Sequence, residues 1–103
     1  MFDFLKKMFN SAPEVDYRQL TQQGALILDV RSPEEYKGGH IPGSTNIPLD
    51  QLAGKIQSIV RQKKPVITVC RSGARSGMAV DILRRAGVEA YNGGPWGSLQ
   101  RKL

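Results

Sequence analysis

The sequence is poor in cysteine: Cys70 is the single one in a chain of 103 residues. One cysteine excludes a disulfide within the chain and a zinc site built from several thiolates. The chain also lacks an apolar run near the ~18 residues that a membrane-spanning helix requires. Cys70 is therefore either a buried small side chain or a reactive thiol, and the residues next to it in the sequence distinguish these two interpretations.

Acidic residues are also few, with 9 Asp and Glu against 15 Lys and Arg, so the net charge is +6. A surface of this charge attracts anionic partners in general. The basic residues are dispersed, however, and no RNA- or DNA-binding motif accompanies them. We interpret them as a solvated basic face and expect no nucleic-acid partner.

The beginning of the chain differs in pattern from the rest. Apolar residues at helical spacing in residues 1–9 predict an amphipathic N-terminal segment over residues 1–12, followed by one domain over residues 13–103. We expect the segment to pack on the domain or on a partner chain, and a helix at a membrane surface is the alternative. Its apolar part is too short for a secretory signal, which predicts a cytoplasmic protein.

Strand and helix patterns alternate along the domain. Uninterrupted apolar runs predict buried strands at residues 25–30 and 66–69, with shorter strands at 45–48 and 88–91. Helices are expected at 17–23, from Ser32 onward, at 49–63, after Cys70 as far as Gly87, and at 96–103, while residues 92–95 read as a turn. This alternation predicts an α/β fold with a parallel sheet and helices on both faces.

The loop after the second buried strand carries the most chemical information. Its residues are Cys70, Arg71, Ser72, Gly73, Ala74, Arg75 and Ser76. A glycine-containing turn of this kind can direct its N–H groups inward, and Ser72 or Ser76 can cap the following helix. The N–H groups, the helix N-terminus and the arginines would stabilise a thiolate, so Cys70 is predicted to be a nucleophile. The alternative is a core cysteine beside an ordinary surface turn.

Three motifs in the same order resemble those of rhodanese domains. Residues 28–36 and 39–48 are similar to the first rhodanese motif, residues 70–76 to the active-site loop, and Gly93, Gly94 and Trp96 to the closing motif. The resemblance implies a rhodanese-like three-layer sandwich, with a central, mostly parallel sheet of about five short strands. It also implies no metal and no organic cofactor.

The resemblance implies that Cys70 is the catalytic residue of a thiosulfate sulfurtransferase. Cys70 would take sulfane sulfur from thiosulfate or a similar small anionic donor, and pass it from a persulfide to a thiol or protein cysteine. The loop residues that would bind the donor are Arg71, Ser72, Gly73, Ala74, Arg75 and Ser76. Arg75 could equally anchor the loop on a carboxylate, with Asp29 as the expected partner. Asp29 and Arg31 are expected to form a structural ion pair or to support the loop.

Two further functions share this loop. A persulfide carrier would receive sulfur from one protein and deliver it to another, and a phosphatase or arsenate reductase would use the same fold. The loop from Cys70 to Arg75 has six residues, one fewer than in the related phosphatases and arsenate reductases. This shorter loop favours sulfur transfer over phosphate-ester hydrolysis. His40 lies in a segment that is structural in the rhodanese family, so it is not expected to transfer a proton, and Trp96 is expected to pack.

Overall fold

Four parallel strands form the sheet of residues 14–103, the part of the chain that the computed structural model describes. The strands are β1 (Leu26–Asp29), β2 (Thr45–Asn46), β3 (Val66–Cys70) and β4 (Ala90–Pro95), and their order in the sheet is β2-β1-β3-β4. The predicted α/β fold with a parallel sheet is confirmed. The described sheet has four strands rather than about five.

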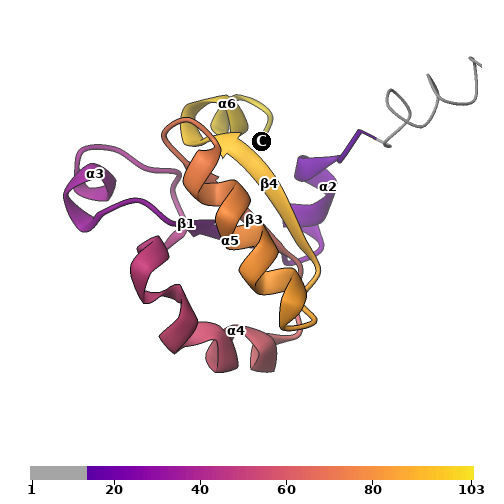
Figure 1. Cartoon of the computed structure of the whole chain (residues 1–103). Helices are drawn as coiled ribbons and strands as arrows, with labels where there is room; N and C mark the ends of the chain where they lie inside the picture. Colours follow the sequence, from indigo (N-terminus) through magenta and orange to yellow (C-terminus); the bar gives the residue numbers. More distant parts are fainter. Residues whose placement is uncertain (1–13) are drawn as a thin grey trace, which may run out of the picture.

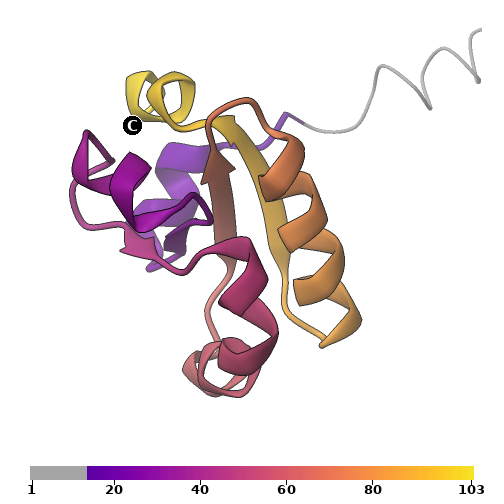
Figure 2. The ribbon, with the colours of Figure 1, turned by 60° about the vertical axis from the view of Figure 1, so that its left-hand side comes forward.

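Helices cover both faces of the sheet, as expected. They are α2 (Tyr17–Gln22), α3 (Pro33–Lys37), the 3-10 helix η1 (Leu49–Lys55), α4 (Ile56–Gln62), α5 (Ala74–Arg85) and α6 (Trp96–Arg101). Figure 1 shows α5 in front of β3 and β4, with α6 near the upper ends of these strands. In Figure 2 the orange helix α5 lies on one side of the strands and the indigo helix α2 on the other.

The alternation of side chains along the strands divides the core into two layers. Leu28 and Val66 face the layer under α5, η1 and α4, together with Leu83. Ile27 and Ile67 point to the opposite face, where they pack with Leu99 of α6. Cys70 belongs to the first layer, so its side chain lies on the α5 side of the sheet.

The helix expected over residues 49–63 divides into two parts. Residues Leu49–Lys55 form a 3-10 helix that contains Gly54, and regular α-helix begins only at Ile56. Glycine is unfavourable inside an α-helix because its backbone has the most conformational freedom to lose, which accounts for the late start. Lys63 ends α4 in the left-handed conformation, with φ of 53°.

The turn predicted at residues 92–95 is wrong, because these residues belong to β4. Asn92 pairs in register with Thr68 of β3, and Pro95 lies opposite Cys70 beyond a local irregularity. A Cβ atom on Gly93 would lie 2.9 Å from the Thr68 carbonyl oxygen and 2.9 Å from Ile67 Cγ2. Gly93 therefore permits a close approach of β3 and β4. The composition of residues 92–95 had suggested a turn instead.

The expected amphipathic segment at residues 1–12 lies outside the described residues. Among residues 14–103, no helix combines the length and the apolar character that crossing a membrane requires.

Candidate active site

The site lies at one edge of the sheet, where two neighbouring parallel strands end. Asp29, the last residue of β1, pairs with Val69 of β3, and Cys70 follows directly. Arg31 is two residues beyond Asp29, in the segment that leads from β1 to α3. Ligands of open parallel sheets bind at this edge, and the structure puts Cys70 there, as the sequence predicted.

Hydrogen-bond donors surround the sulfur of Cys70. The side chain is fully buried, and burial by itself disfavours the thiolate and raises the pKa of the thiol. The Ser76 hydroxyl, 3.4 Å from Sγ, and the backbone N–H groups of Ser76, Gly73 and Ser72 act in the opposite direction. The Gly73 N–H donates to Sγ at 2.9 Å. These hydrogen bonds outweigh burial, so the pKa of Cys70 is lowered from its ordinary value of 9.0.

Gly73 sets the conformation of the loop. Its φ of 102° is in the left-handed region, and it occupies the N-cap position of α5. The expectation that Ser72 or Ser76 caps this helix is wrong, because no side chain makes the cap hydrogen bond. Ser76 instead lies in the first turn of α5, with its hydroxyl near the sulfur, and the turn at Gly73 aims its own N–H at the same atom.

Arg75 is held by a carboxylate, but its partner is Glu35 and not Asp29. Arg75 Nη1 and Nη2 donate to the two oxygens of Glu35 at 2.6 and 2.9 Å. Glu35 also accepts from Ser32 in a capping box that begins α3. The hydrogen bond from Arg75 contributes most to lowering the pKa of the Glu35 carboxyl to about 2. Glu35 is thus a residue of the site that the sequence did not indicate.

Asp29 and Arg31 form the ion pair that the sequence predicted. Arg31 Nη2 lies 2.7 Å from Asp29 Oδ2, and its Nε donates to Asp29 as well. Both side chains are buried, and Arg31 also donates to the Gly39 carbonyl at 2.7 Å. The guanidinium lies 4.8 Å from the centre of the Trp96 ring. The pair therefore holds the end of β1 against the residue 39 loop and α6.

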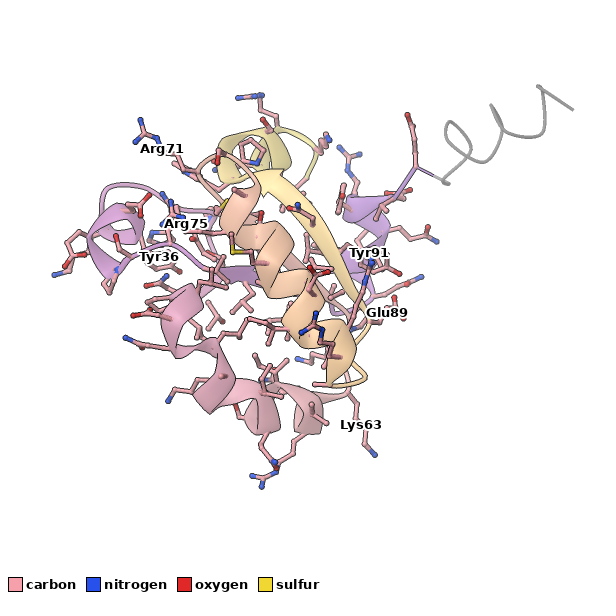
Figure 3. The ribbon with its side chains drawn as sticks, viewed as in Figure 1. Tyr36, Lys63, Arg71, Arg75, Glu89 and Tyr91 are labelled. Carbon is pink, nitrogen blue, oxygen red and sulfur yellow. The ribbon has the colours of Figure 1, made fainter. Side chains whose placement is uncertain are left out.

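The remaining residues of the loop face water. Arg71, Ser72 and Ala74 are exposed. Figure 3 shows Arg71 pointing outward from the top of the molecule and Arg75 turned toward α3. Of the two arginines, Arg71 is thus the one that extends into solvent beside the loop.

His40 and Trp96 are placed as the sequence predicted. His40 Nδ1 is 2.8 Å from the Tyr36 carbonyl oxygen, and its ring stacks on that of Tyr36 with centroids 3.8 Å apart. Trp96 packs in the second core layer. Neither residue is bonded to the sulfur of Cys70 in the part of the chain that the structure describes.

Asn92 is a site residue that the sequence did not indicate. Its side chain accepts a hydrogen bond from Ser76 Oγ at 2.6 Å and donates one to the Gly73 carbonyl at 3.1 Å. It reaches the loop because β4 runs beside β3 as far as Pro95. The glycines that follow Asn92 had suggested a turn and so concealed this contact.

A surface pocket borders the loop at Arg75. This pocket of about 420 Å³ lies between the start of α3 and the start of η1, with Arg75 on one side. Among residues 14–103, no three His, Cys, Asp or Glu side chains gather to hold a metal ion. The groups that the structure describes at this edge are the Cys70 thiol with its lowered pKa, the Arg75–Glu35 pair and the exposed Arg71.

Sequence relatives of the chain include a thiosulfate sulfurtransferase and a putative sulfur carrier protein. The chain is 39% identical over 90 residues to the Bacillus subtilis protein YqhL, which covers 86% of this chain and 70% of that protein. It is 39% identical over 61 residues to the thiosulfate sulfurtransferase PspE of Escherichia coli, covering 58% of this chain and 59% of PspE. It is 32% identical over 83 residues to the putative sulfur carrier protein YrkF of Bacillus subtilis, covering 76% of this chain and 44% of YrkF.

The fold and a family model lead to the same family. A solved structure of a rhodanese with anions from E. coli superimposes with a TM-score of 0.67 at 32% identity, covering 73% of this chain and 91% of that one. The model of the rhodanese-like domain matches residues 12–94. This match includes the strands, the Cys70 loop and the glycines of β4. The chain belongs to the rhodanese-like domain family.

Proposed function

We propose that the protein is a sulfurtransferase that moves sulfane sulfur from thiosulfate, or a similar anionic donor, to a thiophilic acceptor through a persulfide on Cys70. The observation that carries this proposal is the N–H of Gly73 donating to Sγ at 2.9 Å, in a site that lowers the pKa of the thiol. A thiolate held in this way is a nucleophile, and the lowered pKa increases the share of Cys70 in that form.

In the first half-reaction, the Cys70 thiolate attacks the outer sulfur of thiosulfate. The S–S bond of the donor breaks, its electron pair leaves with sulfite, and a new S–S bond joins the outer sulfur to Cys70. The terminal sulfur of this persulfide carries the negative charge, and the loop N–H groups stabilise it as an oxyanion hole stabilises oxygen. Because Cys70 is fully buried, we expect the loop to move when the donor enters.

In the second half-reaction, an acceptor thiolate or cyanide attacks the terminal sulfur. The persulfide bond breaks, and its electron pair returns to Cys70 as thiolate. The pocket lined by Arg75 does not include Cys70, so we expect the acceptor, like the donor, to reach the sulfur when the loop moves. Two half-reactions through one covalent intermediate give ping-pong kinetics, and they call for neither a metal nor an organic cofactor.

The test is the formation of thiocyanate from thiosulfate and cyanide. We expect Cys70→Ala to abolish it, because the chain has no second thiol to carry the sulfur. Ser58→Ala, an exposed position on α4 far along the chain from the loop, is the matched control and should keep the activity. Activity that survives in Cys70→Ala would contradict the persulfide mechanism.

A persulfide carrier is the second candidate, and the enclosure of Cys70 together with the similarity to YrkF favours it. A carrier would show a Cys70 adduct of about 32 Da, one sulfur atom, by mass spectrometry, with slow release to cyanide. A strong adduct with weak thiocyanate formation would select the carrier, and rapid turnover would select the enzyme. For either function we propose a cytoplasmic location, where thiols stay reduced, which cell fractionation can test.

A further inference from the structure

The hydroxyl group of Ser76 lies between two groups that can each accept its proton. Ser76 is fully buried, and its Oγ is 2.6 Å from Asn92 Oδ1 and 3.4 Å from Cys70 Sγ. A serine hydroxyl has one proton to donate and lone pairs with which to accept. At any moment, Ser76 can donate fully to only one of the two.

The orientation of the Asn92 amide follows from its other partners. The Gly94 N–H donates to Asn92 Oδ1 at 2.9 Å, and Asn92 Nδ2 donates to the Gly73 carbonyl at 3.1 Å. A backbone N–H can only donate and a carbonyl can only accept, so a flipped amide would lose both hydrogen bonds. Oδ1 therefore faces Ser76, and since Oδ1 carries no proton, Ser76 is the donor.

With Ser76 as the donor to Asn92, the hydrogen bonds around the sulfur differ between the thiol and the thiolate of Cys70. A neutral thiol can donate its own proton to Ser76 Oγ, while Ser76 donates to Asn92. A thiolate has no proton and can only accept, so the Ser76 hydroxyl must turn from Asn92 to the sulfur to stabilise it. The thiol proton leaves to solvent in this change, no covalent bond between heavy atoms is made or broken, and Asn92 Oδ1 keeps the Gly94 N–H.

We propose that Asn92 is a positioning residue of the Cys70 site: it holds the hydroxyl proton of Ser76 while Cys70 is a thiol, and it yields that proton when the sulfur is negatively charged. Asn92 thereby opposes ionisation of Cys70 and assists its return to the neutral state. The proposal rests on the sulfur-transfer function for the reaction it serves, in which Cys70 Sγ alternates between a charged thiolate and the uncharged inner sulfur of a persulfide.

The surrounding backbone keeps this competition in place. The Thr68 hydroxyl donates to the Ser76 carbonyl at 2.9 Å, which fixes the first turn of α5 against β3. A Cβ atom on Gly77 would lie 3.3 Å from Asn92 Nδ2, so the absence of a side chain there leaves room for the amide. Asn92 acts on Cys70 through Ser76 and does not itself contact the sulfur.

Charged groups also face this region, and the variants below leave all of them in place. Arg75 of α5, with its partner Glu35 of α3, lies on one side. The pair of Asp29 and Arg31 follows β1. Arg71 extends from the loop itself. A change in the titration of Cys70 in the alanine variants, which add no charge, therefore reports on the hydrogen bonds.

The experiment is a titration of the Cys70 thiol in the full chain, by the pH dependence of its alkylation rate. In Asn92→Ala, the Ser76 proton has no side-chain competitor, so we expect the pKa of Cys70 to fall by roughly half a unit to one unit, about a 3- to 10-fold shift in the ionisation equilibrium. A purely structural Asn92 predicts the opposite. Loss of its loop contacts would loosen the N–H donors and raise the pKa.

Adding Asn92→Ala to the Ser76→Ala variant shows whether Asn92 acts on Cys70 through Ser76. We expect Ser76→Ala to raise the pKa of Cys70, and we expect Asn92→Ala to produce no fall when it is added to Ser76→Ala. A rise or no change in Asn92→Ala alone would overturn the proposal, as would an equal fall in the Ser76→Ala background.

Asn92→Asp provides a second measurement if Asn92→Ala does not fold. Its carboxylate should retain the Ser76 proton more strongly, so the pKa of Cys70 should rise, and by more than it rises when Asn92→Asp is added to Ser76→Ala, where only the new charge acts. An equal rise in the two backgrounds, a fall or no change would contradict the proposal. The titration uses no sulfur donor. Failure to form thiocyanate would therefore contradict the proposed function and leave this result standing.

Discussion

Two arginine–carboxylate pairs hold the region around Cys70, and they differ in their access to water. In the pair of Arg31 and Asp29 the side chains are 4% and 0% exposed, with 2.7 Å between the nearest atoms. In the pair of Arg75 and Glu35 they are 35% and 32% exposed, with 2.6 Å between the nearest atoms. The distances are almost equal, so the difference in energy between the pairs comes from their surroundings.

The comparison separates a fixed support from an adjustable one. A buried charge that loses its partner cannot be solvated by water. Breaking the first pair therefore costs much of the free energy of unfolding, and the pair is rigid. Water competes for both members of the second pair, so its net contribution is small and it can open. The adjustable pair is the one attached to the Cys70 loop, which has to admit a sulfur donor.

The same chemical change at the two carboxylates gives the largest predicted contrast. Asp29→Asn leaves the buried Arg31 guanidinium without a countercharge, and we expect it to lower the free energy of unfolding by about 3–5 kcal/mol. Glu35→Gln is the matched variant, with an expected loss below about 1 kcal/mol. Urea denaturation measures both. Equal losses would show that burial does not distinguish the pairs.

The kinetic contrast between the two loop arginines is expected to be smaller. Arg75 is neutralised by Glu35, whereas Arg71 is exposed, so we expect Arg71→Ala to raise the KM for thiosulfate about tenfold, ~1.4 kcal/mol, with little change in kcat. Arg75→Ala should mainly lower kcat, because the loop loses its anchor. Arg71→Lys is the control that keeps the charge. If Arg75→Ala raises KM and Arg71→Ala does not, Arg75 is the residue that binds the donor.

The acid titration of the exposed pair should give the smallest effect. The folded protein holds the pKa of Glu35 at about 2, below the ordinary 4.5, so folding favours the ionised carboxyl. Its stabilising contribution is therefore complete above about pH 4.5 and is lost as the pH falls toward 2. We expect the difference in urea midpoint between wild type and Glu35→Gln to shrink over this range. A difference that is constant with pH would mean that the ion pair is not its source.

The positions of the strands and of Cys70 were predictable because they depend on local pattern. The apolar runs that became β1 and β3 are long enough to be buried on both faces, and the parallel order then places Cys70 at the ligand-binding edge. The contacts that complete the site depend on residues distant in sequence. Glu35 is 40 residues from Arg75, and Asn92 is 16 residues from Ser76.

Predictions from local sequence were incomplete or wrong at residues that also make contacts with distant parts of the chain. Glu35 completes the capping box of α3 in the structure, and this local role gives no sign of its second contact with Arg75. Glycine is common in turns, yet Gly93 lies in strand β4. Glycine is needed there because a side chain would collide with β3. Ser76 is a common helix cap, but Gly73 takes the cap position and leaves the Ser76 hydroxyl to the sulfur.

The complete burial of Cys70 also bears on the survival of the protein in air. Thiolates exposed to peroxide are oxidised to sulfenic acid and then irreversibly to higher acids. Many proteins rescue a sulfenic acid by disulfide formation with a second cysteine, and this chain has none. Enclosure by the loop is therefore the protection against oxidation that the fold itself gives to the Cys70 thiol.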